Sequence, residues 1–369
     1  MSKKRILIVK PLMTIMRYHF LRSLEMSKFY DITWIIHHGH YGDINFDLYD
    51  HPGHTIIQMG KKPKKNNRFS NNIWLIPFYL HVRKHLKSNK YDLILVHIER
   101  FCFLLPIISP TNNYVLQLFT SSVSNSAFRN FVIDTEQKIQ IHFYKKIIIG
   151  TQWMSEKFKL QDKQVICPRW GDTQISKKLK TFDLIRLVYL GTLTNRNIHE
   201  TVEGLGLFLK KNSLTATISY DIIGTGSKEY VDLIIEKINQ YDLQDIVNIH
   251  GFLSDEEIEP FFDQCNIGVA YIPITAYYTD VVATKLYEYH LSGMVAIATE
   301  TNENIKVVTS VNGVLIKDNS GSFADGLNRI YNNLSSWSSA TIFEECKVKT
   351  MEYLVANEVV PAFNKMIEK

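Results

Sequence analysis

The chain has 369 residues, of which 45% are hydrophobic and 21% are charged. At roughly 100–200 residues per domain this length predicts two domains, and the apolar fraction excludes global disorder. Ten prolines and 17 glycines exclude a collagen-like or low-complexity chain. The apolar run 6–9 is too short for a signal-peptide core, and no uncharged apolar run approaches a membrane span. We therefore expect a cytoplasmic protein, soluble or peripheral on the inner face of a membrane.

Charge and cysteine distribution narrow the classes further. Residues 1–180 hold 28 Lys and Arg against 12 Asp and Glu, whereas the remainder holds 14 against 25. The opposite net charges of the two halves indicate two domains with different partners. The basic domain is expected to attract anions such as lipid headgroups or phosphates. The four cysteines lie far apart without a CxxC pair, which favours reduced thiols and no zinc site.

Apolar runs alternate with helical patterns through the first half of the chain. Because these runs are continuously apolar, they indicate parallel strands buried on both faces. Alternation of strand and helix predicts a doubly wound α/β domain over residues 1–170. The predicted strands are Lys4–Lys10, Asp31–His37, Tyr91–His97, Tyr114–Leu118 and Lys145–Gly150, with helices ending near Met26 and spanning Ile73–Leu86.

A break at Cys167–Asp172 precedes a polar, lysine-rich stretch, so residues 171–182 are predicted to be a linker. A second α/β domain follows over 183–345, and the tail 343–369 is predicted to be helical with a bend near Pro361. The predicted strands of this domain are 186–190, 217–223, 247–250, 267–272, 295–299 and 313–316; the helices are 198–210, 229–240, 254–265, 284–292 and 322–332.

The segment Asp280–Gly293 combines a loop carboxylate with a helix that begins near Thr284. Helix N-termini present free N–H groups and a positive dipole end to anions. Lys285 adds a cation in the first turn, and Glu288, at i+3, lies on the same face and could accept hydrogen bonds from a ribose. The alternative is a surface helix with an ordinary acid–base pair.

Two glycine turns follow buried strands of the second domain. Gly191 lets the backbone approach a ligand, and Arg196 could bind phosphate oxygens with its fork of donors, although an exposed loop arginine is the alternative. Gly224-Thr-Gly226 resembles half a dinucleotide fingerprint. No GxGxxG, P-loop or Asp-x-Asp motif occurs, so a nicotinamide enzyme and a metal–diphosphate chelate of that type are disfavoured.

Six segments of the second domain, taken in chain order, resemble the family 4 glycosyltransferases of the GT-B fold. These segments are Leu187–Gly191, IIGTGS (222–227), Val247–Leu253, CNIGVAYIP (265–273), TKLYEYHLSGMVAIAT (284–299) and NGVLI (312–316). The resemblance covers roughly residues 185–335. It implies two Rossmann-like domains facing a cleft, with donor bound by the second domain, acceptor by the first, and a C-terminal helix (346–369) crossing back. The family moves a sugar, commonly from a UDP-linked donor, with retention and without a required metal.

The resemblance also implies residue roles. Asp280 and Glu288 have the spacing of the family's two acidic residues, with Asp280 facing the donor sugar and Glu288 holding the ribose. Arg196, Lys285 and the backbone at Thr284–Leu286 would contact the diphosphate. Gly251, Phe252 and Leu253 would lie along the nucleobase.

This sequence departs from the family pattern at several positions. Thr192 stands where an arginine is usual, Asp280 where a glutamate is usual, and the glycine-rich loop after the first strand is missing. The acceptor-side histidine is not evident at Gln117–Thr120. His97 is the nearest residue that could replace this histidine as a catalytic residue. The alternative is that His97 has only a structural role.

We therefore expect a metal-independent hexosyltransferase acting on a glycan or lipid-linked acceptor in bacterial surface polysaccharide or glycan synthesis. Alternatives are a non-hydrolysing UDP-sugar epimerase or a non-catalytic partner subunit that binds a nucleotide or glycan.

The basic first half suggests where the acceptor is met. Lys61–Phe69 is strongly basic, and Pro77–Lys87 mixes aromatics with cations. Such clusters attract anionic lipid, and aromatic side chains suit the membrane interface. We expect docking on the cytoplasmic leaflet; a solvated basic surface is the alternative. No nucleic-acid-binding module is present.

Overall fold

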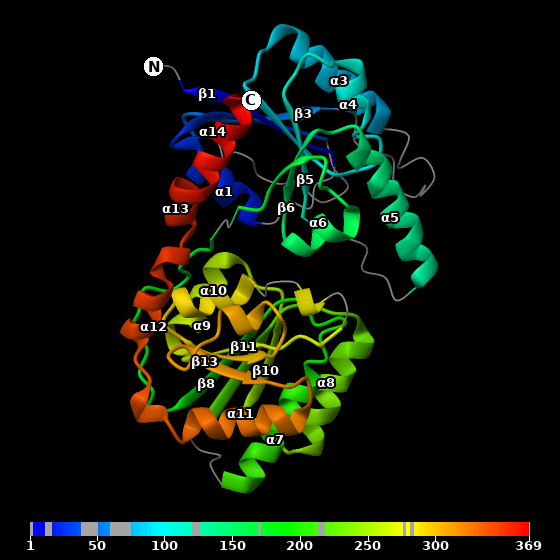
Figure 1. Cartoon of the computed structure of the whole chain (residues 1–369). Helices are drawn as coiled ribbons and strands as arrows, with labels where there is room; N and C mark the ends of the chain where they lie inside the picture. Colours follow the sequence, from blue (N-terminus) through cyan, green and yellow to red (C-terminus); the bar gives the residue numbers. More distant parts are fainter. Residues whose placement is uncertain are drawn as a thin grey trace. The chain divides into compact units, whose positions relative to one another are not determined.

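A computed structural model describes residues 3–11, 17–37, 51–59, 75–119, 126–168, 171–212, 218–275, 278–280 and 284–368. The chain divides into two compact units (Figure 1). Unit 1 comprises residues 1–170 and 351–369, and unit 2 comprises residues 171–350. The basic Lys61–Phe69 segment lies outside the described residues.

The residues predicted as a linker belong to unit 2. The Asp172 amide donates to the Lys349 carbonyl at 3.1 Å. Lys180 is buried and donates to the Phe262 carbonyl at 2.5 Å and to Ser176 Oγ at 2.9 Å. A buried ammonium group needs such partners, so this stretch is held against the unit instead of spanning solvent.

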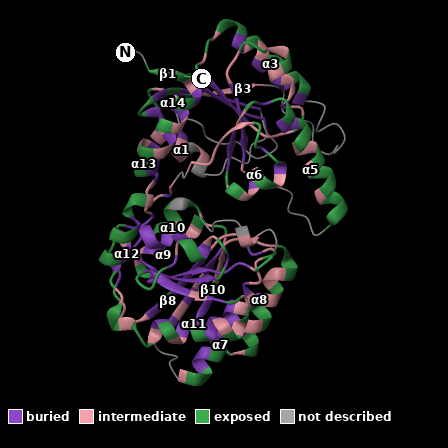
Figure 2. Ribbon diagram, viewed as in Figure 1, coloured by how far each residue is buried: buried purple, intermediate pink, exposed green. Residues whose placement is uncertain are grey.

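Unit 1 contains a parallel sheet with strand order β3-β2-β1-β4-β5-β6-β7 in its described part. All of its strand pairs are parallel, and the central strands are buried on both faces (Figure 2). The strands are β1 (Lys4–Lys10), β2 (Tyr30–His37), β3 (His54–Met59), β4 (Leu93–His97), β5 (Tyr114–Leu118), β6 (Lys146–Ile149) and β7 (Gln164–Ile166).

Helices cover both faces of this sheet. One face packs against α3 (Leu75–Ser88), α4 (Leu104–Ile108) and α6 (Gln152–Phe158), and the residues Phe78 and Tyr79 of α3 are fully buried there. Those two aromatics therefore serve the core, and the prediction that they reach a membrane interface is wrong for them. The longer α5 (Ala127–His142) belongs to the same face but buries only Gln140 and Ile141.

The other face of the unit 1 sheet is covered by α1 (Arg17–Ser27) and by the end of the chain. The C-terminal segment consists of α13 (Met351–Leu354), a π-helical turn (Val355–Val359) and α14 (Val360–Glu368). Phe363 is fully buried, and the Tyr30 hydroxyl donates to the Val360 carbonyl at 3.1 Å. Pro361 lies in the first turn of α14, where its missing N–H leaves no helical hydrogen bond unmade.

Unit 2 contains a second parallel sheet, with order β10-β9-β8-β11-β12-β13. The strands are β8 (Ile185–Leu190), β9 (Ile218–Ile223), β10 (Val247–Gly251), β11 (Ile267–Ala270), β12 (Val295–Thr299) and β13 (Gly313–Ile316). The helices are α7 (His199–Asn212), α8 (Lys228–Gln240), α9 (Asp255–Gln264), α10 (Thr284–Leu291), α11 (Ser320–Tyr331) and α12 (Ser339–Cys346).

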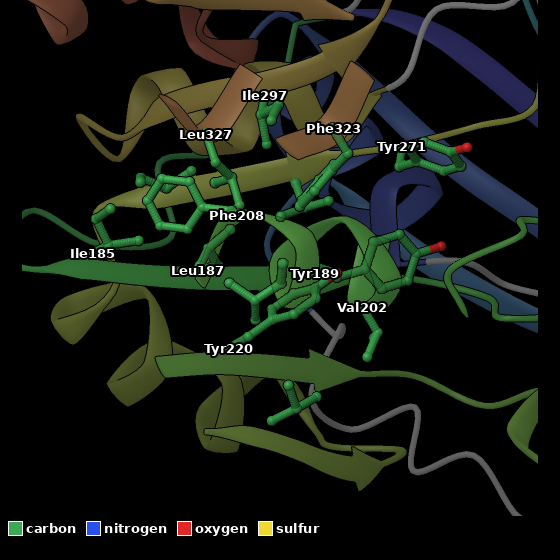
Figure 3. Close-up of a cluster of buried hydrophobic side chains, with 14 of the residues drawn as sticks. Ile185, Leu187, Tyr189, Val202, Phe208, Tyr220, Tyr271, Ile297, Phe323 and Leu327 are labelled. Atoms are coloured by element: carbon green, nitrogen blue, oxygen red, sulfur yellow. The ribbon is translucent and has the colours of Figure 1, made fainter. Parts of the chain in front are cut away.

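The core of unit 2 joins the strands to two helices. Figure 3 shows Leu187, Tyr189 and Tyr220 from the strands beside Phe208 of α7 and Phe323 of α11, all essentially inaccessible to solvent. Both sheets are doubly wound, as predicted. The strand order reverses between β1 and β4 in unit 1 and between β8 and β11 in unit 2. Ligands of open parallel sheets bind at the carboxyl ends of the strands at such reversals.

Candidate active site

The predicted site residues of unit 2 gather where its strand order reverses. Two glycine turns end β8 and β9 there. Gly191 has φ +145° and Gly224 has φ +149°, conformations that side chains rarely adopt. A Cβ on Gly224 would lie 1.8 Å from the Gly191 carbonyl oxygen, so the two loops can pack this closely only because residue 224 is glycine.

Lys285 extends over the first of these turns. It belongs to the first turn of α10, and its Nζ would lie 3.1 Å from a Cβ on Gly191. The ammonium group also lies 3.9 Å from the centroid of the Tyr189 ring, and the Tyr189 hydroxyl is held by donation to the Thr192 carbonyl at 2.6 Å. Burial, and secondly the charge of Arg196, lower the pKa of Lys285 to about 7, against a raising effect from Glu288. Lys285 is half-buried, and an anion bound at this place would compensate its charge.

Arg196 is held by an aromatic residue that the sequence analysis did not identify. Its guanidinium carbon lies 4.3 Å from the ring centroid of Tyr278, and its Nη1 donates to the Tyr278 hydroxyl. Tyr278 begins a 3₁₀ turn, Tyr278–Asp280, after β11. Each of the two cations of the site is thus paired with a tyrosine ring, an arrangement that stabilises both while leaving their charge available. The feature of the sequence that could have pointed to Tyr278 is the tyrosine pair just before Asp280.

The loop that carries Arg196 is itself tightly held. Asn195 and Asn197 have positive φ values of 57° and 53°. The Tyr230 hydroxyl donates to Asn195 Oδ1 at 2.5 Å, and the Leu193 amide donates to the Thr225 carbonyl at 2.9 Å. Asparagine tolerates this left-handed backbone better than most residues, which explains its presence on both sides of Arg196.

Glu288 is only 3% exposed, so the alternative of an ordinary surface helix is wrong. It lies one turn after Lys285 in α10, close enough to raise that lysine's pKa. Leu286 between them is completely buried in the core, so only its backbone could meet a ligand, whereas Thr284 at the helix start is exposed. Asp280 ends the 3₁₀ turn, but its side chain lies outside what the structure describes.

Tyr289 fixes the position of α10 on the sheet. Its ring lies over Gly268 of β11, where a Cβ would come within 2.2 Å of it. The Leu190 amide at the end of β8 donates to the Tyr289 hydroxyl at 3.1 Å. A glycine in one strand and a backbone donor in the next therefore hold α10 over the reversal in strand order.

The third turn of the site ends β10. The Gly251 carbonyl accepts a hydrogen bond from the Gly224 amide at 2.7 Å, and a Cβ on Gly251 would meet nothing within 4 Å. Phe252 is 80% exposed, and Leu253 packs partly against the core. An open backbone followed by an exposed ring offers a surface on which a flat ring could lie.

His97 belongs to unit 1, at the carboxyl end of β4. Its ring stacks on Trp34 at a centroid distance of 6.4 Å and meets His19 edge-on at 5.1 Å. Burial, reinforced by the charge of Lys10, holds the pKa of His97 well below its usual value. His97 is therefore neutral at pH 7. Throughout the described ranges of both units, no three His, Cys, Asp or Glu side chains converge as metal ligands.

Comparisons with known proteins agree with this geometry. Residues 172–340 match the family described as glycosyl transferases group 1. No match was found among curated proteins.

Solved structures resemble the chain over nearly its whole length. Sucrose-phosphate synthase from Thermosynechococcus elongatus is 13% identical with a TM-score of 0.74, the match covering 99% of this chain and 100% of that one. HepE from Anabaena, in complex with UDP, is 14% identical with a TM-score of 0.68, covering 99% and 98%. WaaG, a glycosyltransferase involved in lipopolysaccharide biosynthesis, is 13% identical with a TM-score of 0.64, covering 95% and 97%. The GT-B fold is thereby confirmed. The match of residues 172–340 to the glycosyl transferases group 1 family, taken together with this fold, identifies the protein as a glycosyltransferase.

Proposed function

We propose that the protein transfers a sugar from a UDP-linked donor, bound by unit 2, to a glycan or lipid-linked acceptor bound by unit 1. The observation that carries this proposal is that Lys285 extends over the Gly191 turn with the charge of Arg196 close enough to lower its pKa, while Glu288 is buried one helical turn away. HepE has also been solved in complex with UDP-glucose, which supports a UDP-linked sugar as donor. The spaced motifs of unit 2 favour assignment to family 4.

The chemistry follows from the charges. When the bond between the anomeric carbon and the diphosphate oxygen breaks, negative charge grows on the departing diphosphate. Lys285 and Arg196 stabilise that charge, together with backbone N–H groups at the start of α10. In this proposal the two cations perform the role that a metal ion performs in other transferases. Glu288 accepts hydrogen bonds from the ribose hydroxyls, and the Phe252 ring lies along the uracil.

Asp280 and His97 complete the proposed catalytic set. Asp280 faces the donor sugar, and transfer proceeds with retention, as in the family that the sequence resembles. Because His97 is neutral and a weak base, its role is to orient the acceptor hydroxyl by a hydrogen bond.

The donor assignment is tested by a thermal-shift panel of nucleotide sugars followed by calorimetry. A true donor stabilises the folded protein by mass action, by about 2.7 kcal/mol at a concentration one hundred times its dissociation constant. We expect UDP-sugars to raise the melting temperature and the corresponding GDP- and ADP-sugars to do so less. Arg196→Gln should lose most of the shift, and Lys317→Met, which removes an exposed lysine of unit 2, should keep it. Equal shifts with all nucleotide sugars, or with none, would contradict the proposal.

We further propose that unit 1 docks on an anionic membrane surface through α5. Large apolar side chains on one face of this helix and at its C-cap point to solvent; they are Phe128, Phe131, Val132, Ile139 and Phe143. Phe128 and Phe131 are 76% and 68% exposed. An amphipathic helix with aromatic residues on its outer face is typical of interfacial binding.

The charges around α5 also favour an anionic membrane surface as the partner. Its carboxylates are engaged by cations of neighbouring elements, Asp134 by Lys157 at 2.9 Å and Glu136 by Arg100 at 2.7 Å. Arg129 and Lys138 remain exposed along the helix. In the described part of the chain no helix is long and apolar enough to span a bilayer, so any such contact would be made at the surface.

Flotation with vesicles tests this docking. We expect the protein to float with phosphatidylcholine vesicles that contain phosphatidylglycerol and to stay behind with phosphatidylcholine alone. The double variant Phe128→Ser, Phe131→Ser should lower the membrane partition constant at least about a hundredfold, because each phenylalanine contributes about 1.5–3 kcal/mol when buried. Ile235→Ser, an exposed apolar residue of unit 2, should change nothing. If the wild type, the double variant and Ile235→Ser float equally well, α5 is not the docking surface.

A further inference from the structure

The turn that follows β10 is preceded by a histidine that is not among the proposed donor contacts. β10 is an outermost strand of the unit 2 sheet, and its register against β9 shifts between Ile249 and Gly251. His250 is therefore an extra residue of the strand, opposite no residue of β9. Such β-bulges occur at sheet edges and beside active sites, where they redirect the side chains nearby. Here the next residues are Gly251 and Phe252, which belong to the turn proposed to meet the nucleobase.

His250 is held by two neighbouring elements, β9 and α9. Its Nε2 lies 2.7 Å from Asp221 Oδ1 of β9, and because a carboxylate can only accept, this nitrogen donates. Its ring lies against the ring of Phe261 in α9, with centroids 4.6 Å apart. The second oxygen of Asp221 faces the Cys265 thiol at 4.0 Å. Burial, and secondly the charge of Asp221, raise the pKa of Cys265 to about 12, so the thiol keeps a proton to share with this carboxylate.

Core stability does not explain the pair of His250 and Asp221. The Asp221 side chain is only 15% exposed. Val188, which pairs with Asp221 across the sheet, and Ile223, two residues further along β9, are buried in an apolar cluster. Removing a carboxylate from water costs free energy that a single ion pair recovers only in part, so an apolar pair of similar size would often be as stable. A shielded pair that stability does not require points to a role in fixing one local conformation.

The conformation fixed in this way is that of the turn between β10 and α9. His250 holds its first end. At the other end the Ser254 amide donates to Glu257 Oε2 at 2.8 Å, where α9 begins. Between these two ends the Phe252 ring is 80% exposed, so it makes little packing contact of its own. The position of the ring is therefore determined by the two ends of the turn, and His250 is one of them.

We propose that His250, held by Asp221, positions the turn 251–253 and thereby sets how strongly the donor site discriminates between nucleobases. A base is selected when hydrogen-bonding groups and a stacking ring are held in fixed places, whereas a loosely held turn adapts to uracil and adenine alike. In this proposal His250 does not touch the donor; it is a positioning residue that acts through Phe252. The inference rests on the proposed function, which places the nucleobase along the Phe252 ring.

Calorimetry of the full chain with UDP and with ADP tests this role. In the wild type we expect UDP to bind more tightly. His250→Ala should weaken UDP binding about tenfold and ADP binding less, so that the ratio of the two affinities falls at least about threefold. Asp221→Ala should have the same effect, whereas Asp221→Asn keeps an acceptor for the imidazole and should retain most of the ratio. Glu203→Ala removes a similarly shielded ion pair, Glu203 with Lys237 at 2.7 Å between α7 and α8, and should leave the ratio unchanged.

Hydrogen exchange of backbone amides gives a second measurement that needs no ligand. The amides of residues 251–254 should exchange about tenfold faster in His250→Ala than in Glu203→Ala, because only the first variant frees the turn. Equal exchange in the two variants would show that His250 does not hold the turn, and the proposal would be overturned.

The nucleotide titrations separate this inference from the donor assignment. A wild type that does not prefer UDP to ADP contradicts the UDP-linked donor itself. A wild type that prefers UDP, with His250→Ala losing affinity for both nucleotides equally or for neither, leaves the donor assignment standing and overturns the positioning role. A merely weakened fold lowers both affinities together, so a change in their ratio is specific to the turn.

Discussion

Binding of a nucleotide sugar should draw a proton into the protein at Lys285. With a pKa of about 7 in the free protein, Lys285 is about half protonated at pH 7. A diphosphate beside its Nζ returns the pKa toward the ordinary lysine range, so the bound protein is fully protonated there. The expected uptake is about 0.5 proton at pH 7, about 0.9 at pH 8 and about 0.1 at pH 6.

Affinity should change with pH by the same linkage. Above pH 7 each pH unit removes about 1.4 kcal/mol of binding free energy, because the free lysine must first be protonated. The affinity for UDP-glucose should therefore be about tenfold lower at pH 8 than at pH 6. UDP-glucose is the better probe than UDP, because its diphosphate is esterified at both ends and has no ionisation of its own near neutral pH.

The assay is calorimetry in buffers of different ionisation enthalpy, whose slope gives the number of protons taken up. Lys285→Arg keeps the charge but should abolish the uptake, since arginine stays protonated. Lys317→Met should retain the uptake. Tight binding of UDP-glucose at pH 7.5 with no proton uptake in the wild type would show that Lys285 does not lie beside the diphosphate, and the proposed site would fall with it.

Five further substitutions test the rest of the site. Glu288→Ala should weaken UDP-glucose binding by about 1–3 kcal/mol through loss of charge-assisted hydrogen bonds, and unchanged affinity in calorimetry would contradict its ribose role. Gly224→Ala places a Cβ 1.8 Å from a carbonyl oxygen and should lower the melting temperature sharply, whereas Gly251→Ala meets open space and should cost only the about 1–2 kcal/mol of a left-handed backbone; similar losses would refute the packing argument. Arg196→Ala should slow sugar transfer, and Tyr278→Phe, which keeps the ring but loses the hydroxyl, should slow it less; equal rates in the two variants would show that the ring face does not position Arg196.

Local sequence patterns predicted most of the elements that form the site. Continuous apolar runs identified β8, β11 and β12 within a residue or two, because a strand buried on both faces needs no distant information to be apolar throughout. The i, i+3 spacing placed Lys285 and Glu288 on one helix face. By contrast, β3 and β7 were not predicted, since their residues are only partly buried and carry a weaker hydrophobic signal.

The amino-acid sequence by itself determined two doubly wound domains of opposite charge and a helix that begins with a cation one turn before an acid. The tertiary structure alone decided which groups surround those residues: Tyr278 meets Arg196 from 82 positions away, and His19, Trp34 and Gln117 meet around His97. It also decided that the apolar face of α5 points to solvent while that of α3 is buried. Periodicity states that a helix has an apolar face, but only the positions of the other elements determine whether anything covers it.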